Sequence, residues 1–526
     1  MHEFIARHQE QIVGVLSGFD RLVFRGTLRS IAYADGMKRY LSANEILLKD
    51  LGRHVEEVSQ RLKEAALTAA RVADRPVTYL PSSQTDKEAV ARQIVAADGL
   101  SEGLVCVLSC VEPCRSFEIR RDRDSKKLVL EARYRKCLFF YQYWLHPVFG
   151  FMNARIQTWF PFAIQVCLNG REWLGRQLDA AGVAYVRQDN CFPWIANWAQ
   201  AQRLMDRQVN ANWPRLLASV ARPLNPLHST IFRAYPVRYY WSTYQSEWAT
   251  DLVFREAAAL RRLYPRLLHH AITTFGSTEV MRFLGRRLPL SGHVPQRFAG
   301  EAVSDLRQRE EGVRVKHRVN GNSVKLYDKA FTPVGNVLRA ETTIHNVADL
   351  RVYRPKEGDP DGAAAWRVMR RGIADLHRRA DVSRAATERY LDALASIDDD
   401  TTLEELLRQL GRPTHWHGRR VRALHPLAPD DSALLAAVSR GEFTLNGFRN
   451  RDLRAIFFPY PAKTLPEARR RSAWVSRQLR LLRAHSVIRK VAGTHRYLVT
   501  PAGRTVITAV LTALGTTVRQ LTPVAA

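Results

Sequence analysis

The chain has 526 residues, and its 80 Lys and Arg against 51 Asp and Glu give a formal net charge of +29 at pH 7. Such a charge attracts polyanions, so nucleic acid is the first partner class to consider. No apolar run approaches the roughly 20 residues that span a bilayer, the N-terminus MHEFIARHQEQ is too polar for a signal peptide, and six cysteines make no disulfide framework. We therefore expect a cytoplasmic protein with reduced thiols and no membrane partner.

The first half of the chain is predicted to contain two segments. Residues 1–72 are expected to be mostly helical, because IVGVLSGFDRLVF and EEVSQRLKEAALTAA carry apolar residues three and four apart. Residues 73–235 are expected to form an α/β domain. RPVTYLP, KEAVARQIVAADG and GLVCVLSCV indicate a strand, a helix ending at Gly99 and a second strand, which is a βαβ unit. FEIRRDRDSKKLVLEARY then indicates two strands around a turn, and FAIQVCL, NGREWLGRQLDAAG and VAYVRQ repeat the strand–helix–strand order.

The second half is predicted to contain four segments. These are a basic β-meander domain with helices over 236–360, a helical connector over 361–397, a linker rich in Asp, Pro and Arg over 398–431, and a C-terminal domain over 432–526. The expected fold class is α/β and α+β in several domains, with a mixed-sheet body, the basic β-meander and a C-terminal winged-helix domain.

The meander shows strict alternation. VRVKHRV is followed by the hairpin turn Asn320-Gly321-Asn322 and by SVKLYDK, and a third strand, NVLRAETTIHN, comes after a loop. One face should carry valines, leucines and His317. The other should carry polar side chains: Arg314, Lys316, Arg318, Lys325, Tyr327, Lys329, Arg339, Glu341, Thr343 and His345. On this face Arg314, Lys316, Arg318 and Lys325 would neutralise phosphates, and Tyr327 could stack on a base.

The order LYDK followed by LRAETTIHN resembles the catalytic strands of replication initiators of small rolling-circle plasmids and related phages. Those proteins nick one DNA strand with a tyrosine, stay joined to the 5′ phosphate and use a divalent metal. The resemblance implies that Tyr327 is the nucleophile, and that Lys325, Lys329 or Arg339 stabilises phosphoryl charge. It also implies that Glu341 helps to hold Mg²⁺ or Mn²⁺. Further carboxylates would be needed, and the candidates are Glu247 and Asp251, four apart and on one face if helical, and Asp20. The alternative is a cross-strand aromatic in a basic sheet, without chemistry.

The last 95 or so residues are predicted to form three helices, a hairpin and a closing helix. On the third helix Val475, Leu479 and Leu482 fall on one face. The roughly opposite face carries Arg469, Ser472, Ser476, Arg480 and Arg483, and the hairpin carries Arg489, Lys490, His495 and Arg496. Between Arg440 and Lys490 there are 13 Lys or Arg and 3 Asp or Glu. This order resembles the winged-helix DNA-binding domains of bacterial repressors, in which arginines and serines contact phosphates and base edges.

Two hypotheses follow. In the first, the chain is a metal-dependent nicking or strand-transfer endonuclease of a mobile element or replicon. In the second, it is a binding protein without catalytic activity: either a site-specific DNA-binding regulator or the protein component of a ribonucleoprotein that binds a structured RNA. The chain as a whole resembles a bacterial family met near mobile elements, a resemblance that implies no particular activity. DNA is the favoured partner and RNA the alternative. A homodimer is compatible with the sequence, since winged-helix proteins commonly pair about a two-fold axis.

Overall fold

The computed structural model describes residues 1–285, 301–309, 312–328, 335–359, 361–398, 402–443 and 447–517. By its internal contacts the chain divides into two compact units. Unit 1 comprises Met1–Val15, Thr250–Met369 and Asp381–Ala526, and unit 2 comprises Leu16–Ala249 and Arg370–Ala380. Each unit is therefore assembled from segments that lie far apart in the sequence.

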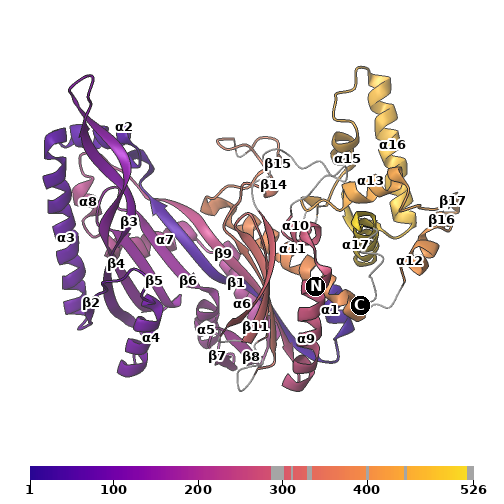
Figure 1. Ribbon diagram of the computed structural model, residues 1–526, viewed down its shortest axis with the longest axis horizontal. Helices are drawn as coiled ribbons and strands as arrows, with labels where there is room; N and C mark the ends of the chain where they lie inside the picture. Colours follow the sequence, from indigo (N-terminus) through magenta and orange to yellow (C-terminus); the bar gives the residue numbers. More distant parts are fainter. Residues whose placement is uncertain are drawn as a thin grey trace. The chain divides into compact units, whose positions relative to one another are not determined.

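The protein is a mixed α/β protein, as the sequence predicted (Figure 1). The prediction placed the meander in a domain of its own, whereas its strands belong to the same large sheet as those of the predicted α/β domain. The eleven strands of this sheet run in the order β10 (Ala302–Arg309), β11 (Gly312–Val319), β12 (Asn322–Asp328), β13 (Val337–Ile344), β9 (Tyr240–Phe254), β1 (Ile12–Thr27), β6 (Ile164–Asn169), β5 (Gly150–Gln157), β4 (Leu128–His146), β3 (Gly103–Arg121) and β2 (Val77–Tyr79). The boundaries between the two units fall inside β1 and β9.

Strand β1 corrects the prediction of a mostly helical N-terminal segment. The α-helices there are α1 (His2–Arg7), α2 (Ala34–Ala43) and α3 (Leu51–Val72), whereas Ile12–Thr27 is extended. A strand that is covered on both faces carries a near-continuous apolar run, and such a run also matches helical spacing. β1 is of this kind, because nearly every residue from Leu16 to Phe24 is buried.

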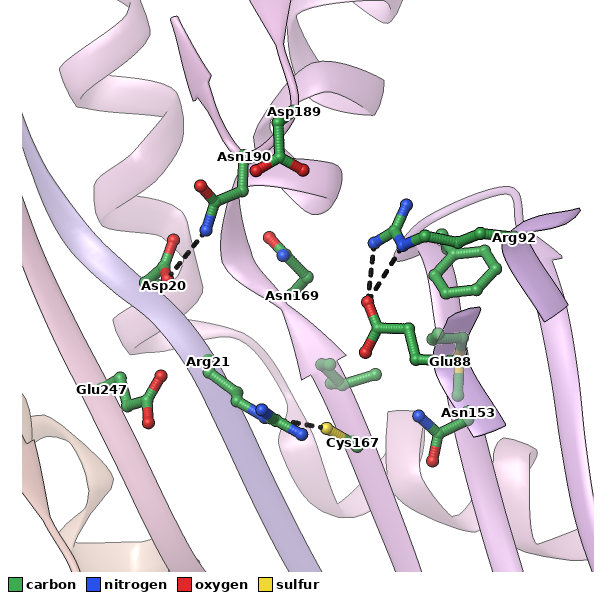
Figure 2. A pocket seen from close by; sticks show the side chains of 13 residues that line it. Asp20, Arg21, Glu88, Arg92, Asn153, Cys167, Asn169, Asp189, Asn190 and Glu247 are labelled. Carbon is green, nitrogen blue, oxygen red and sulfur yellow. Dashed lines mark hydrogen bonds and ion pairs between the residues drawn. The ribbon is translucent and has the colours of Figure 1, made fainter. Parts of the chain in front are cut away.

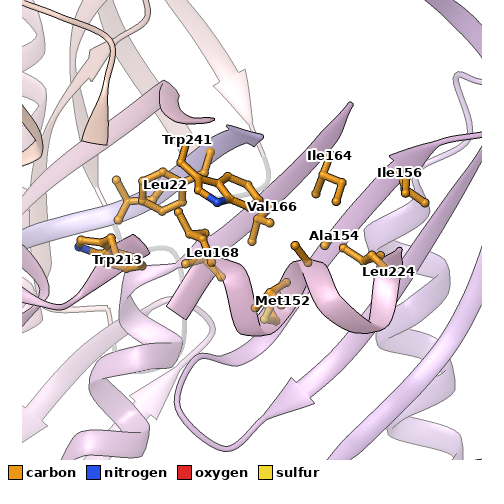
Figure 3. Packing of buried hydrophobic residues seen from close by; sticks show 14 of the residues in the cluster. Leu22, Met152, Ala154, Ile156, Ile164, Val166, Leu168, Trp213, Leu224 and Trp241 are labelled. Atoms are coloured by element: carbon orange, nitrogen blue, oxygen red, sulfur yellow. The ribbon is translucent and has the colours of Figure 1, made fainter. Parts of the chain in front are cut away.

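A smaller apolar cluster of unit 2, with Cys106, Leu108 and Tyr141, covers one face of β3 and β4. The larger cluster lies on the opposite face of the strands (Figure 3). Strand β6 alternates strictly, with Ile164, Val166 and Leu168 buried in this cluster. The covering helices are α2, α3, α5 (Gly170–Ala180), α6 (Trp198–Asn210) and α7 (Trp213–Leu224). Gly170 begins α5 next to β1, and a Cβ atom there would lie 1.7 Å from the carbonyl oxygen of Phe19. Only glycine permits this close approach.

The predicted βαβ unit is confirmed. Helix α4 (Lys87–Asp98) connects β2 to β3, and the two strands are parallel. The Asp86 side chain caps the start of α4, and Gly99 ends it with a φ of 60°. The second predicted strand–helix–strand repeat forms β6, α5 and β7 (Tyr185–Gln188), but β7 pairs with β8 (Cys191–Ile195) in a separate hairpin. The short helix α8 (His228–Ile231) completes the elements of unit 2 that precede β9.

Unit 1 contains the predicted meander. Strand β11 pairs with β12 and β12 with β13, all antiparallel, and the turn residues Asn320 and Gly321 both have positive φ. Helices α9 (Ala257–Thr274) and α10 (Ser277–Phe283) and the second half of α11 (Leu376–Leu394) cover one face of these strands. The apolar cluster between them contains Val315, Val324, Leu326, Leu338 and Ala340. A small hairpin, β14 (Arg351–Arg354) and β15 (Ala365–Val368), follows the meander.

The C-terminal part of unit 1 has its own apolar cluster. The predicted order of elements is confirmed as α13 (Pro429–Val438), α15 (Asn450–Phe457), α16 (Leu465–Ala484), the hairpin β18 (Ile488–Lys490) and β19 (Tyr497–Val499), and α17 (Pro501–Gly515). The predicted linker is corrected, because it contains α12 (Leu403–Leu410) and the hairpin β16 (Thr414–Trp416) and β17 (Arg419–Val421). Leu410 and Leu424 are buried in the same cluster. These elements are too short for periodicity to reveal them.

No helix in the described part of the chain is both long and apolar enough to cross a membrane. The six cysteines are all described, and all six are free thiols.

Candidate functional site

The meander places most of the predicted catalytic residues together on one sheet face. In the register of the strands, Tyr327 is opposite Arg339, Lys325 is opposite Glu341, and Lys316 is opposite Lys325. Directly opposed residues share a face of the sheet, so the sequence-based assignment of faces is confirmed. Lys329 lies outside the described residues.

The side chains on this face form charge-assisted contacts. Arg314 Nη1 donates to the Tyr327 hydroxyl at 3.1 Å. Lys325 Nζ is ion-paired with Glu341, and Arg339 binds Asp251 through two parallel hydrogen bonds of 2.6 and 2.9 Å. Burial opposes ionisation of Glu341, but Lys325, Arg339 and the Thr343 hydroxyl together hold the pKa of that carboxyl below its usual value. This face therefore combines a tyrosine with paired cations and carboxylates.

The side chains on this face are less exposed to solvent than an open polar face would be. Tyr327 is 8% exposed, Arg339 1% and Glu341 4%. The alternation of a strand indicates which side chains share a face, but it does not say whether that face is covered. The cations nearer the sheet edge are more accessible, since Lys316 is half-buried and Arg318 is exposed and 3.7 Å from Asp305.

Lys316 lies in a locally cationic environment. Burial lowers its pKa, and the neighbouring Lys325, Arg314 and Arg318 lower it further, whereas Asp305, opposite Lys316 on β10, raises it. Like charges that face each other across a strand pair are destabilising. An anion such as a phosphate would relieve this repulsion.

A polar cavity of about 230 Å³ lies in unit 2 (Figure 2). It is lined by β1, β5, β6, β9, α4 and the β7–β8 turn through Asp20, Arg21, Glu88, Arg92, Phe151, Met152, Asn153, Cys167, Leu168, Asn169, Asp189, Asn190 and Glu247. Carboxylate oxygens of Asp20 and Glu247 lie within 4.8 Å of each other. Two acidic oxygens at this separation are suitable ligands for a hard divalent cation.

Neighbouring side chains orient the groups of this cavity. Asn190 Nδ2 donates to Asp20 at 3.3 Å, and Arg21 Nε donates to the Cys167 sulfur at 3.3 Å. The closeness of Cys167 raises the pKa of Arg21 above its usual value. Arg92 binds Glu88 and covers the ring of Phe151, with 4.2 Å between the guanidinium carbon and the ring centre. No sequence motif indicates this cavity, because its residues come from segments far apart in the chain.

The predicted carboxylates fall in both units. Asp251 and Glu341 lie in unit 1, where each has a cationic partner, and Glu247 lies in unit 2. Glu247 and Asp251 would share a face if their segment were helical, but both lie on strand β9. A shared metal ion for Glu247, Asp251 and Glu341 stays a prediction.

The C-terminal helices present the predicted basic side chains. On α16, Val475, Leu479 and Leu482 are buried as expected, and Arg469, Ser476 and Arg480 are exposed. Arg489 and Lys490 are exposed on the hairpin, while Ser472, Arg483 and Arg496 are half-buried. The amide nitrogen of Asn450, at the start of α15, donates to the Ser472 carbonyl oxygen and to the Ser476 hydroxyl, at 2.9 Å each. These contacts fix α15 against α16.

Hairpin β14–β15 supports the same region. The Tyr353 hydroxyl accepts a hydrogen bond from Arg451 of α15 at 2.6 Å, and the Arg496 guanidinium lies 5.3 Å from the centre of the Tyr353 ring. Arg483 lies over the ring of Trp416 at 4.8 Å. The aromatic rings hold these arginines in place without neutralising them.

Neither a family model, nor a curated protein, nor a solved structure matches this chain. The resemblances to winged-helix repressors and to rolling-circle initiators therefore rest on sequence pattern alone.

Proposed function

We propose that this protein binds duplex DNA through its C-terminal helices and hairpin, in the manner of a winged-helix domain. The observation that carries the proposal is the two-sided character of α16. Its apolar side is fixed in the C-terminal core, and its other side exposes Arg469, Ser476 and Arg480. An α-helix fits the major groove of B-form DNA, where arginine and serine reach guanine edges and phosphates.

The hairpin adds a second contact. Arg489 and Lys490 are exposed on β18, directly after α16 in the chain. With α16 in the groove, these cations are suited to the neighbouring phosphates. DNA is favoured over RNA, because the major groove of an RNA duplex is too deep and narrow for a helix to read.

We expect the affinity of the full chain for a 30-base-pair DNA duplex to fall steeply with salt. Six cations could contact phosphate in this domain: Arg469, Arg480, Arg483, Arg489, Lys490 and Arg496. At a slope of about −0.9 per contact, raising salt from 50 to 200 mM should weaken binding by about 10³-fold. Fluorescence anisotropy across a salt series measures the slope. An affinity that does not change with salt would exclude phosphate contacts as the basis of binding.

A second candidate function is strand nicking at Tyr327. The observation that favours it is the hydrogen bond from Arg314 to the Tyr327 hydroxyl, since a cationic donor stabilises a phenolate. In this reaction the Tyr327 oxygen bonds to phosphorus, the bond from phosphorus to the 3′ oxygen breaks, and the phenol proton ends on the departing 3′ oxygen. The chain stays joined to the 5′ phosphate.

Nicking of this class uses Mg²⁺ or Mn²⁺, which stabilises charge on the phosphoryl oxygens. In unit 1, Lys325 neutralises Glu341 and Arg339 neutralises Asp251. Either carboxylate would have to exchange its cationic partner for a metal.

Tyr327→Phe is expected to abolish a covalent protein–DNA adduct formed in Mn²⁺, while the affinity for DNA stays within about twofold of the wild type. A denaturing gel of end-labelled single-stranded DNA incubated with the protein measures the adduct, and EDTA should remove it. Tyr353→Phe is the matched control, because Tyr353 also accepts a hydrogen bond from an arginine. An adduct that persists in the Tyr327 variant would assign the chemistry elsewhere.

A further inference from the structure

Strands β3 and β4 form a ribbon that extends beyond the sheet of unit 2. They pair with each other from Gly103 and Leu145 to Arg121 and Leu128. Strand β5 pairs with β4 only from Phe139 onward, and β2 pairs with β3 only over Val107–Ser109. The segment after β5 still contacts the ribbon as far as Ser116, because Thr158 N donates to the Leu138 carbonyl oxygen and Ser116 Oγ donates to the Phe160 carbonyl oxygen. From Phe117 and Ala132 to Arg121 and Leu128 the strands pair only with each other among the described residues. At about 3.3 Å per residue this part is roughly 15 Å long, and Figure 1 shows the ribbon and its turn.

One face of the ribbon is anchored. Phe117 and Leu130 are buried in the core of unit 2, and Ile119 and Ala132 pack against that core. An isolated two-stranded hairpin is marginally stable in water. These apolar contacts therefore hold the ribbon in a defined direction and leave its tip exposed.

The other face of the ribbon carries three arginines and two glutamates, and each arginine has a carboxylate partner. Glu118 lies 3.8 Å from Arg133 and 3.5 Å from Arg135, and Glu131 lies 3.7 Å from Arg120. The arginines along this face are therefore partnered within the ribbon.

The tip of the ribbon is different. Within the turn, the Asp122 carboxylate accepts a hydrogen bond from the backbone amide of Asp124 at 2.9 Å. Arg121, Arg123, Lys126 and Lys127 are all exposed, and they make no ion pair with any described residue. The tip thus carries four accessible cations and the two carboxylates of Asp122 and Asp124, a net charge of +2, at the end of a two-stranded element.

We propose that this ribbon tip inserts into the major groove of duplex DNA and contacts the phosphates with its four cations. The major groove of B-form DNA is about 12 Å wide and admits a two-stranded β-ribbon. The negative charge of the phosphates complements the cations. This inference goes beyond the proposed function, because it assigns a second DNA contact to a different unit and to a different element from α16.

The test compares two double variants of the full chain that remove equal charge from the same ribbon. Arg123→Gln with Lys127→Gln changes the tip, and Arg133→Gln with Arg135→Gln changes arginines that are already paired. We expect the tip variant to bind a 30-base-pair DNA duplex about tenfold more weakly at 0.1 M salt, with a salt slope less steep by about 2. The control variant should match the wild type.

The partner is distinguished by repeating the titration with an RNA duplex of the same sequence. If the tip enters the major groove, the tip variant should bind the RNA duplex with the same affinity as the wild type, because the major groove of an A-form duplex is too narrow for the ribbon. An equal loss on RNA, or a tip variant that binds DNA like the control, would overturn the inference. If the tip variant lowers the affinity for DNA but substitutions at Arg480 and Arg483 of α16 do not, the proposed function is wrong and the ribbon contact stands.

Discussion

Replacing both Arg480 and Arg483 by glutamate is expected to weaken binding to a DNA duplex by about 100-fold or more at 0.1 M salt. Each substitution removes one phosphate contact and its counterion release, and it also places a carboxylate against the phosphate backbone. Arg480 is exposed on α16, and Arg483 is held over Trp416. Neither side chain belongs to the C-terminal core, so the fold should be retained.

Anisotropy titrations at 0.1 M salt measure this effect. The control carries the same charge change on another helix, with Arg53 and Arg61 of α3 replaced by glutamate; both are exposed. If only the overall charge of the protein matters, the two variants should lose equal affinity for DNA. If α16 is the contact surface, the Arg480 and Arg483 variant should lose much more. Equal losses would therefore remove α16 as the contact element.

Asp251→Ala is expected to destabilise unit 1 by about 3–5 kcal/mol. The Arg339 side chain is 2% exposed, and its guanidinium forms two hydrogen bonds with the Asp251 carboxylate. Removing the carboxylate leaves a buried cation without this partner, and the loss of its solvation in water is then poorly compensated. Hydrogen exchange of the β13 amides, measured across a urea series, gives the free energy of unfolding of this unit.

A second variant separates the effect of an uncompensated charge from the effect of altered packing. Asp251→Leu combined with Arg339→Met replaces the ion pair by apolar groups and should recover most of the lost stability. Glu404→Ala is the control, since the Arg408–Glu404 pair on α12 is solvent-exposed and should contribute nothing measurable. If Asp251→Ala were as mild as Glu404→Ala, the buried pair would not be important for stability.

The parts of the fold that the sequence predicted are those with local determinants. The β11–β12 hairpin forms as expected, because Asn320 and Gly321 accept the positive φ values of 48° and 79° that its tight turn requires. The three- and four-residue spacing of its apolar residues likewise predicts the buried side of α16. β1 was mistaken for a helix, because a strand buried on both faces has no strand-like alternation.

The candidate site was predictable only in part for the same reason. Alternation placed Tyr327, Arg339 and Glu341 on one face, but their burial depends on what packs there. The approach of Asp20 to Glu247 joins segments that are distant in the sequence, and no periodicity encodes such a contact.

The division of unit 1 into three sequence segments affects how the chain folds during synthesis. Phe4 is buried in the same apolar cluster as Tyr390 and Leu391. At about 5–20 residues per second, a ribosome needs roughly 20–75 s to make the residues between them. Phe4 and its neighbours therefore emerge long before their partners exist, while the residues of unit 2 are being made. We expect the nascent N-terminal segment to depend on chaperones during this interval.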